Sequence, residues 1–126
     1  MINIADQLKA LSDETRLRIV NLLYDKELCV CDILKVLDIT QTKASRHLAY
    51  LKNNGFVKDR KEAQWSHYTL IKKENELLKV LVENYLRKEN IYLEDLKHLE
   101  KYFEVKKKCA IWIITWVIHL MMREGD

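Results

Sequence analysis

The sequence predicts a mainly helical domain with one small β-hairpin, and three observations lead to this fold class. The chain has 126 residues, which is room for one domain, with 48% apolar and 33% charged residues, as in a globular protein. Two glycines and no proline disfavour turn-rich sandwiches and favour long helices. Apolar residues recur at helical spacing along most of the chain, whereas residues 56–70 are typical of two strands.

Three helices are predicted before residue 40. The first is marked by the amphipathic spacing of Ala5, Leu8 and Leu11, the second by a buried face of Leu17, Val20 and Tyr24, and the third by an apolar turn of Ile33, Val36 and Leu37. Ser12 is placed to cap the second helix. Asp38–Thr40 is a three-residue break, and Thr40 is a suitable cap for the helix that follows.

The next predicted helix, Gln41–Asn54, has one apolar face and one polar face without acidic residues. Its apolar arc holds Ala44, Leu48 and Leu51. Hydroxyl and basic side chains occupy the remaining arc, namely Thr42, Lys43, Ser45 and Arg46. Gly55 stands where a left-handed residue would end this helix.

Two strands, Phe56–Lys61 and Trp65–Leu70, form the predicted hairpin, which must lean on helices because two strands alone are marginal. Beyond Lys73 the helical pattern returns. Its two apolar stripes are Leu78, Leu81 and Tyr85, and Leu96, Leu99 and Phe103.

The positive charge is concentrated in one stretch. Residues 41–73 carry eight basic and two acidic side chains, a net charge of +6, although the whole chain carries only +3. Such a concentration is expected of a protein that binds a phosphate backbone, and a solvated basic face is the alternative. Two helices around a tight break, followed by a basic hairpin, match the plan of a winged helix-turn-helix that reads DNA. The expected DNA contacts are Thr42, Lys43, Ser45, Arg46 and His47 on the helix, and Arg60, Lys61 and Gln64 on the hairpin.

Several runs together resemble the ArsR/SmtB family of metal-responsive winged-helix repressors. They are Leu11–Ile19, Glu27–Ile33, Ser45–Leu48, Leu51–Lys52 and Gly55–Val57. The resemblance implies a homodimer that binds double-stranded operator DNA, with the stripe Leu78, Leu81 and Tyr85 as dimer surface. Because Met1–Ala10 is no secretory leader, we expect a cytoplasmic protein. It covers about residues 4–90, so we divide the chain into a DNA-binding and sensing domain, 1–90, and a helical extension, 91–126. One departure is the hairpin tip Glu62-Ala63-Gln64, where the family usually has a glycine.

Cys29 and Cys31 are the predicted sensor. Three cysteines argue against a paired disulfide framework and favour a reducing compartment. At the start of a helix both thiols would be biased towards thiolate, the ligand form, and thiolates select soft metals and metalloids. Residues two apart do not face each other on a regular helix, so joining both sulfurs to one atom would distort its first turn.

The Glu27–Asp32 run resembles the site of arsenite- and antimonite-sensing repressors, which implies As(III) or Sb(III) as inducer. Leu34 stands where such sites often have a third cysteine, so the third ligand would be water, hydroxide, a cellular thiol or Cys109. The same scaffold could instead respond to cadmium, to lead or to thiol oxidation. An enzyme is disfavoured because no acid/base or nucleophilic group accompanies the cysteines, and no organic cofactor is implied.

Residues 110–122 form an apolar run interrupted only by Thr115 and His119. A membrane span needs roughly 20 residues, so this run is too short to cross a bilayer. A helix that is apolar on all sides is normally buried, so we expect added dimer contact rather than membrane contact by this tail. Association with a membrane surface or a partner, helped by Lys106–Lys108, is the alternative.

Overall fold

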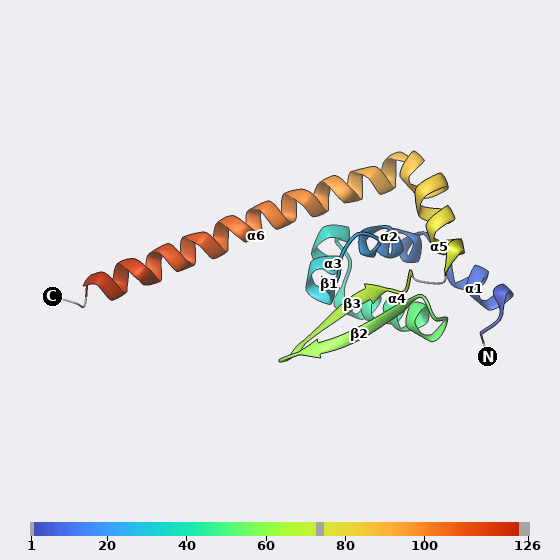
Figure 1. The fold of residues 1–126 in the computed structure, drawn as a ribbon, viewed down its shortest axis with the longest axis horizontal. Helices are drawn as coiled ribbons and strands as arrows, with labels where there is room; N and C mark the ends of the chain where they lie inside the picture. Colours follow the sequence, from blue (N-terminus) through green and yellow to red (C-terminus); the bar gives the residue numbers. More distant parts are fainter. Residues whose placement is uncertain (1, 73–74, 124–126) are drawn as a thin grey trace.

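The computed structural model describes residues 2–72 and 75–123, without the side chains of 108–113 and 123. Its helices are α1 (Ile4–Ala10), α2 (Glu14–Leu23), α3 (Val30–Leu37), α4 (Gln41–Asn53), α5 (Glu76–Val80) and α6 (Asn90–Arg123), and its strands are β1 (Leu28–Cys29), β2 (Val57–Glu62) and β3 (Trp65–Leu70). A π-helical turn, Leu81–Tyr85, and a 3-10 turn, Leu86–Lys88, connect α5 to α6. Figure 1 shows α1 to α5 and the sheet gathered in one body, which α6 passes and then leaves behind. The predicted class, mainly helical with a small β-hairpin, is confirmed.

The sheet has three antiparallel strands in the order β1-β3-β2, one more than the sequence predicts. Cys29 of β1 pairs with His67 of β3. Strand β1 has only two residues, both of them buried, so it shows no alternation that sequence reasoning could detect. Its pairing attaches the cysteine segment directly to the hairpin.

The helix ends follow the capping predictions with one exception. Thr40 accepts a hydrogen bond from the Lys43 amide and begins α4, as predicted. Gly55 has a φ of 78°, the left-handed value expected after this helix. The prediction for Ser12 is wrong, because Asp13 caps α2 by accepting from the Arg16 amide, while the Ser12 hydroxyl donates to the Lys9 carbonyl at 2.7 Å.

The hairpin turns at Ala63 and Gln64, between the paired residues Glu62 and Trp65. Ala63 takes the left-handed φ of 56° that glycine adopts without strain. The missing glycine therefore leaves the hairpin closed at a local conformational cost.

The predicted dimer stripe Leu78, Leu81 and Tyr85 does not form one surface. Leu78 is fully buried in its own subunit, whereas Tyr85 is 64% exposed. The π-helical turn adds residues to that turn of the helix and rotates Tyr85 away from Leu78. The buried stripe is instead Leu78, Val82 and Leu86.

The first half of α6 belongs to the same core as the body. Asp95 of α6 is 1% exposed and accepts two hydrogen bonds from the Arg18 guanidinium, from Nε at 2.8 Å and from Nη2 at 2.9 Å. Beyond residue 113 the described apolar side chains of α6 are exposed, with Met122 at 75%. No helix within residues 2–72 and 75–123 combines the length and apolarity that crossing a membrane requires.

Candidate DNA-reading surface and thiol site

Helix α4 carries the polar surface that the sequence predicts. It follows α3 after the break at Asp38–Thr40, where Asp38 adopts a left-handed φ of 54°, and the two helices pack against each other. Its buried side chains are Ala44, His47, Leu48 and Leu51. Its exposed polar side chains are Thr42, Lys43, Ser45 and Arg46. These four are presented to solvent, where hydroxyl and guanidinium groups would meet base edges and phosphates.

His47 lies between the polar and the apolar arc of α4, and its burial argues against the predicted contact with DNA. The side chain is buried, with Nδ1 3.2 Å from Arg16 Nη1 and 4.0 Å from Asp13 Oδ1. Burial lowers its pKa, and the nearby arginines act in the same direction. His47 therefore joins α4 to the start of α2 and is not available to a DNA groove.

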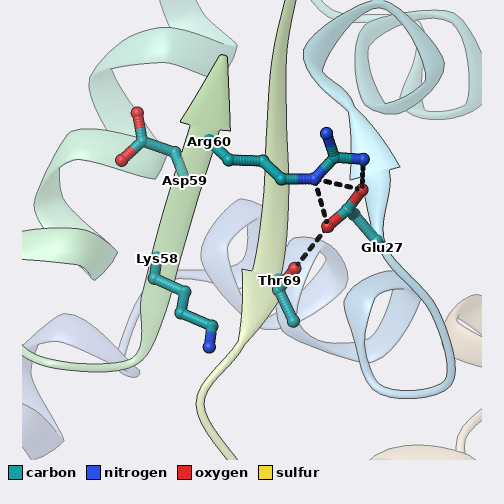
Figure 2. Close-up of a pocket in the computed structure, with 5 residues that line it drawn as sticks. All are labelled: Glu27, Lys58, Asp59, Arg60 and Thr69. Atoms are coloured by element: carbon teal, nitrogen blue, oxygen red, sulfur yellow. Dashed lines mark hydrogen bonds and ion pairs between the residues drawn. The ribbon is translucent and has the colours of Figure 1, made fainter. Parts of the chain in front are cut away.

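Arg60 on the hairpin is held by carboxylates. Its Nε donates to Glu27 Oε1 at 3.0 Å and its Nη1 to Glu62 Oε2 at 3.0 Å. Figure 2 shows the guanidinium reaching across β3 to Glu27, which also accepts from the Thr69 hydroxyl. An open cavity of about 470 Å³ is lined by Glu27, Lys58, Asp59, Arg60 and Thr69. The ion pairs with Glu27 and Glu62 offset the charge of Arg60. Lys61 and Gln64 lie exposed at the hairpin tip.

The two cysteines of the predicted sensor lie together at the start of α3. Cys29 is 5% exposed and serves as the N-cap of α3 with extended backbone, φ −72° and ψ 150°. Its Sγ lies 2.8 Å from Sγ of Cys31, and both thiols are free. The two residues are thus not both on regular helix, so the helix-spacing argument for a distorted first turn does not apply to this pair. One thiophilic atom could reach both sulfurs, since a metal–sulfur bond is about 2.3 Å long.

The environment of Cys31 differs from the prediction as well. Burial raises its pKa to about 11, and the contact with Cys29 and the nearby Asp32 carboxylate act in the same direction. The helix terminus does not overcome these effects. Cys31 is therefore a protonated thiol that must release its proton to become a ligand.

The Asp32 carboxylate, which sequence reasoning missed, lies beside the two cysteines and contacts both Cys29 and α6. Asp32 is 4% exposed, and its Oδ2 accepts from the Cys29 amide at 3.0 Å. Its Oδ1 accepts from the Tyr102 hydroxyl at 2.8 Å and from Lys106 Nζ at 3.0 Å, both on α6. The spacing of Cys29 and Asp32, three residues apart, is that of a capping box and could have signalled the first contact. Nothing in the sequence signals the contacts with α6.

The thiol pair has no further ligand among the residues that the structure describes, because no group of three His, Cys, Asp or Glu side chains is placed there to hold a metal ion. The side chain of Cys109, the predicted alternative donor, lies outside the described ones.

The helix pair α3–α4, followed by the hairpin β2–β3, defines a winged-helix DNA-binding domain. Residues 13–59 match the model of the protein family described as "Bacterial regulatory protein, arsR family". Among solved structures, HlyU from Vibrio cholerae N16961 aligns with a TM-score of 0.60 at 39% identity, over 64% of this chain and 89% of that one. The chain therefore belongs to the arsR family of bacterial regulatory proteins, whose members are transcriptional regulators and not enzymes.

Further relatives indicate the range of the family. The "Arsenical resistance operon repressor" of Escherichia coli K12 is 56% identical over 63 residues, 49% of this chain and 54% of its own length. The "Cadmium resistance transcriptional regulatory protein CadC homolog" of Staphylococcus aureus is 42% identical over 83 residues, 65% of this chain and 66% of its own. A Mycobacterium bovis structure described as a homodimeric winged helix-turn-helix DNA-binding domain aligns with a TM-score of 0.57 at 28% identity, over 69% of this chain and 84% of that one. The chain thus spans about half to two thirds of the length of these curated relatives.

Proposed function

We propose that this protein is a metalloid-responsive transcriptional repressor that binds operator DNA as a homodimer and is released when As(III) or Sb(III) binds Cys29 and Cys31. The convergence of the two sulfurs, 2.8 Å apart at the start of α3, carries the proposal. Thiolates prefer thiophilic ions over hard cations. The arsenical and cadmium regulators among its relatives favour an inducer of that class. We expect the protein to act in the cytoplasm, where reduced thiols and DNA are both present.

DNA reading is assigned to α4 and the hairpin tip. Arg46 is proposed to contact a guanine edge, and Thr42, Lys43 and Ser45 to contact bases or phosphates. Lys61 and Gln64 are proposed to lie along the backbone. Arg60 could contact a phosphate only after breaking its ion pairs with Glu27 and Glu62, so it is proposed to contribute less to DNA binding.

The dimer is proposed to form through the exposed apolar side chains of α1 and α5. In Figure 1 both helices lie at the end of the molecule away from the C-terminus of α6. Ile4 and Leu8 on α1 are 60% and 52% exposed, and Val80 on α5 is 45% exposed. With Tyr85 of the following turn they offer apolar area that a second copy would cover. A two-fold dimer reads an inverted repeat, with its two reading helices about one DNA turn apart.

As(III) or Sb(III) would be held by Cys29 and Cys31, which would supply two thiolates after losing their protons. Because the described residues offer no third donor, the third is proposed to be water, hydroxide, a cellular thiol or Cys109.

Two contacts would carry the signal to DNA. Cys29 pairs with His67 of the hairpin, and α3 packs against α4. A shift of Cys29 would therefore move both DNA-reading elements together. Coupling between two binding sites typically amounts to about 1–3 kcal/mol and is reciprocal, so operator DNA must weaken inducer binding by the same factor.

The test is a titration of the protein–operator complex, measured by fluorescence anisotropy on an inverted-repeat duplex that the protein selects from a random pool. We expect arsenite to release the wild-type protein under reducing conditions. The variants Cys29→Ser and Cys31→Ser should bind the duplex as the wild type does and ignore arsenite. Cys109→Ser is a separate test: it still responds to arsenite if the third ligand is not Cys109, and loses the response if it is.

Parallel titrations with Sb(III), Cd(II), Pb(II) and an oxidant separate the alternatives. Release by cadmium, lead or the oxidant without release by arsenite would replace the metalloid assignment with the corresponding inducer. Release by arsenite from the double variant Cys29→Ser/Cys31→Ser would refute the assignment of the thiol site.

A further inference from the structure

We propose that α6 is a positioning element of the thiol site: Lys106 and Tyr102, acting through Asp32, hold Cys29 in place, so that occupancy of the thiols is coupled to the docking of α6. The inference rests on the proposed function and adds a second output of the same site, towards the C-terminal helix.

The connection is a chain of short contacts through one buried carboxylate. Asp32 uses both oxygens, Oδ2 for the Cys29 amide at 3.0 Å, and Oδ1 for Tyr102 Oη at 2.8 Å and Lys106 Nζ at 3.0 Å. A buried carboxylate needs such partners, because an unpaired charge is costly away from water. The position of Cys29 therefore depends on two side chains that lie more than seventy residues away along the chain.

The same turn of α6 also contacts the segment that precedes the cysteines. Lys26 Nζ lies 4.1 Å from the centroid of the Phe103 ring, within the range of a cation–π contact. Tyr102 and Phe103 meet edge to face, with centroids 5.4 Å apart. Residues 102–106 thus contact the cysteine segment on both sides, at Lys26 before Cys29 and at Asp32 after it.

Next to the contacts made by residues 102–106, the packing between α3 and α6 is open. A cavity of about 350 Å³ lies between the two helices, and Val36, Tyr102 and Val105 are among the residues that line it. The contacts of Asp32 with Tyr102 and Lys106 therefore lie beside a gap in the packing of the two helices. A movement of Cys29 then changes the grip on α6, and release of α6 loosens Cys29, as reciprocal coupling requires.

The test compares Lys106→Met with Lys107→Met, which removes the same charge from the neighbouring exposed lysine of α6. The first readout, taken without ligand, is hydrogen exchange at the amides of residues 29–33. We expect Lys106→Met to speed exchange of the Cys29 amide by about tenfold, the effect of weakening one charge-assisted contact. Tyr102→Phe should have a smaller effect, Lys106→Arg should restore slow exchange, and Lys107→Met should match the wild type.

The second readout is binding of arsenite, measured directly by calorimetry in the absence of DNA. Lys106→Met should weaken arsenite binding by about tenfold, because Cys29 is no longer held in its position beside Cys31. In the wild type, arsenite should also alter hydrogen exchange over residues 99–107 of α6, and in Cys29→Ser/Cys31→Ser it should not.

Two results overturn the inference: exchange at Cys29 that is the same in Lys106→Met and the wild type, or arsenite binding that leaves α6 unchanged. Failure of the wild type to bind arsenite would instead count against the proposed function, and the exchange comparison without ligand would still decide whether α6 positions Cys29.

Discussion

Arg18 of α2 and Asp95 of α6 form an ion pair. Removing either partner should destabilise the folded protein, and the two losses should differ. The Asp95 side chain is 2% exposed, whereas that of Arg18 is 23% exposed. Removing Arg18 therefore leaves a carboxylate without water or a counter-charge, while removing Asp95 leaves a guanidinium that can reach solvent. We expect Arg18→Met to be the more destabilising of the two substitutions.

Removing one partner of a buried ion pair typically costs about 3–5 kcal/mol, because the charge that remains has neither water nor a counter-charge. Arg18→Met should thus lower the free energy of unfolding by about 3–4 kcal/mol at pH 7. Asp95→Asn should cost about 1–2 kcal/mol, since it loses charge-assisted hydrogen bonds but strands no buried charge.

Urea unfolding of the wild type and both variants at pH 7, followed by circular dichroism, measures these differences. The double variant Arg18→Met/Asp95→Leu is the control, because replacing both partners by apolar groups should recover much of the loss. The reasoning is refuted if Arg18→Met costs no more than Asp95→Asn, or if the double variant is no more stable than Arg18→Met.

Four further outcomes are expected. Arg46→Ala should weaken operator binding by about 10- to 100-fold without changing stability, and an unchanged anisotropy titration would remove Arg46 from the reading surface. Burial lowers the pKa of His47, so as the pH falls the unfolded chain protonates this imidazole before the folded chain does. The free energy of unfolding should therefore fall as the pH drops below about 6.5. In urea unfolding, the variant His47→Gln should lack that pH dependence. Ala63→Gly should raise the free energy of unfolding by up to about 1 kcal/mol, because φ at this position is 56°; a loss in urea unfolding would contradict the assigned strain. Truncation after Lys108 should raise the dissociation constant of the dimer if the apolar tail adds contact, and light scattering that shows an equally stable dimer would exclude that role.

Helix α4, the proposed DNA-reading helix, was predictable because its sequence signals are local. The apolar spacing of Ala44, Leu48 and Leu51 sets which side of α4 is buried, and the exposed hydroxyl and basic residues follow from that choice. Thr40 and Gly55 mark the two ends for equally local reasons, a side-chain cap and a left-handed φ. His47 was the exception. It stands between the two arcs, and only the folded structure shows that it is buried and in contact with Arg16.

The neighbours of the thiol site could not be predicted in the same way. The sequence by itself places Cys29 and Cys31 shortly before the proposed reading helix and predicts a soft ligand for them. Only the tertiary structure decides that Cys29 lies in a strand paired with the hairpin and that Asp32 is held by Tyr102 and Lys106 of α6. The physical reason is range: helix spacing, capping and turn chemistry act over a few residues, whereas burial and the pairing of a buried charge depend on segments that meet only when the chain has folded.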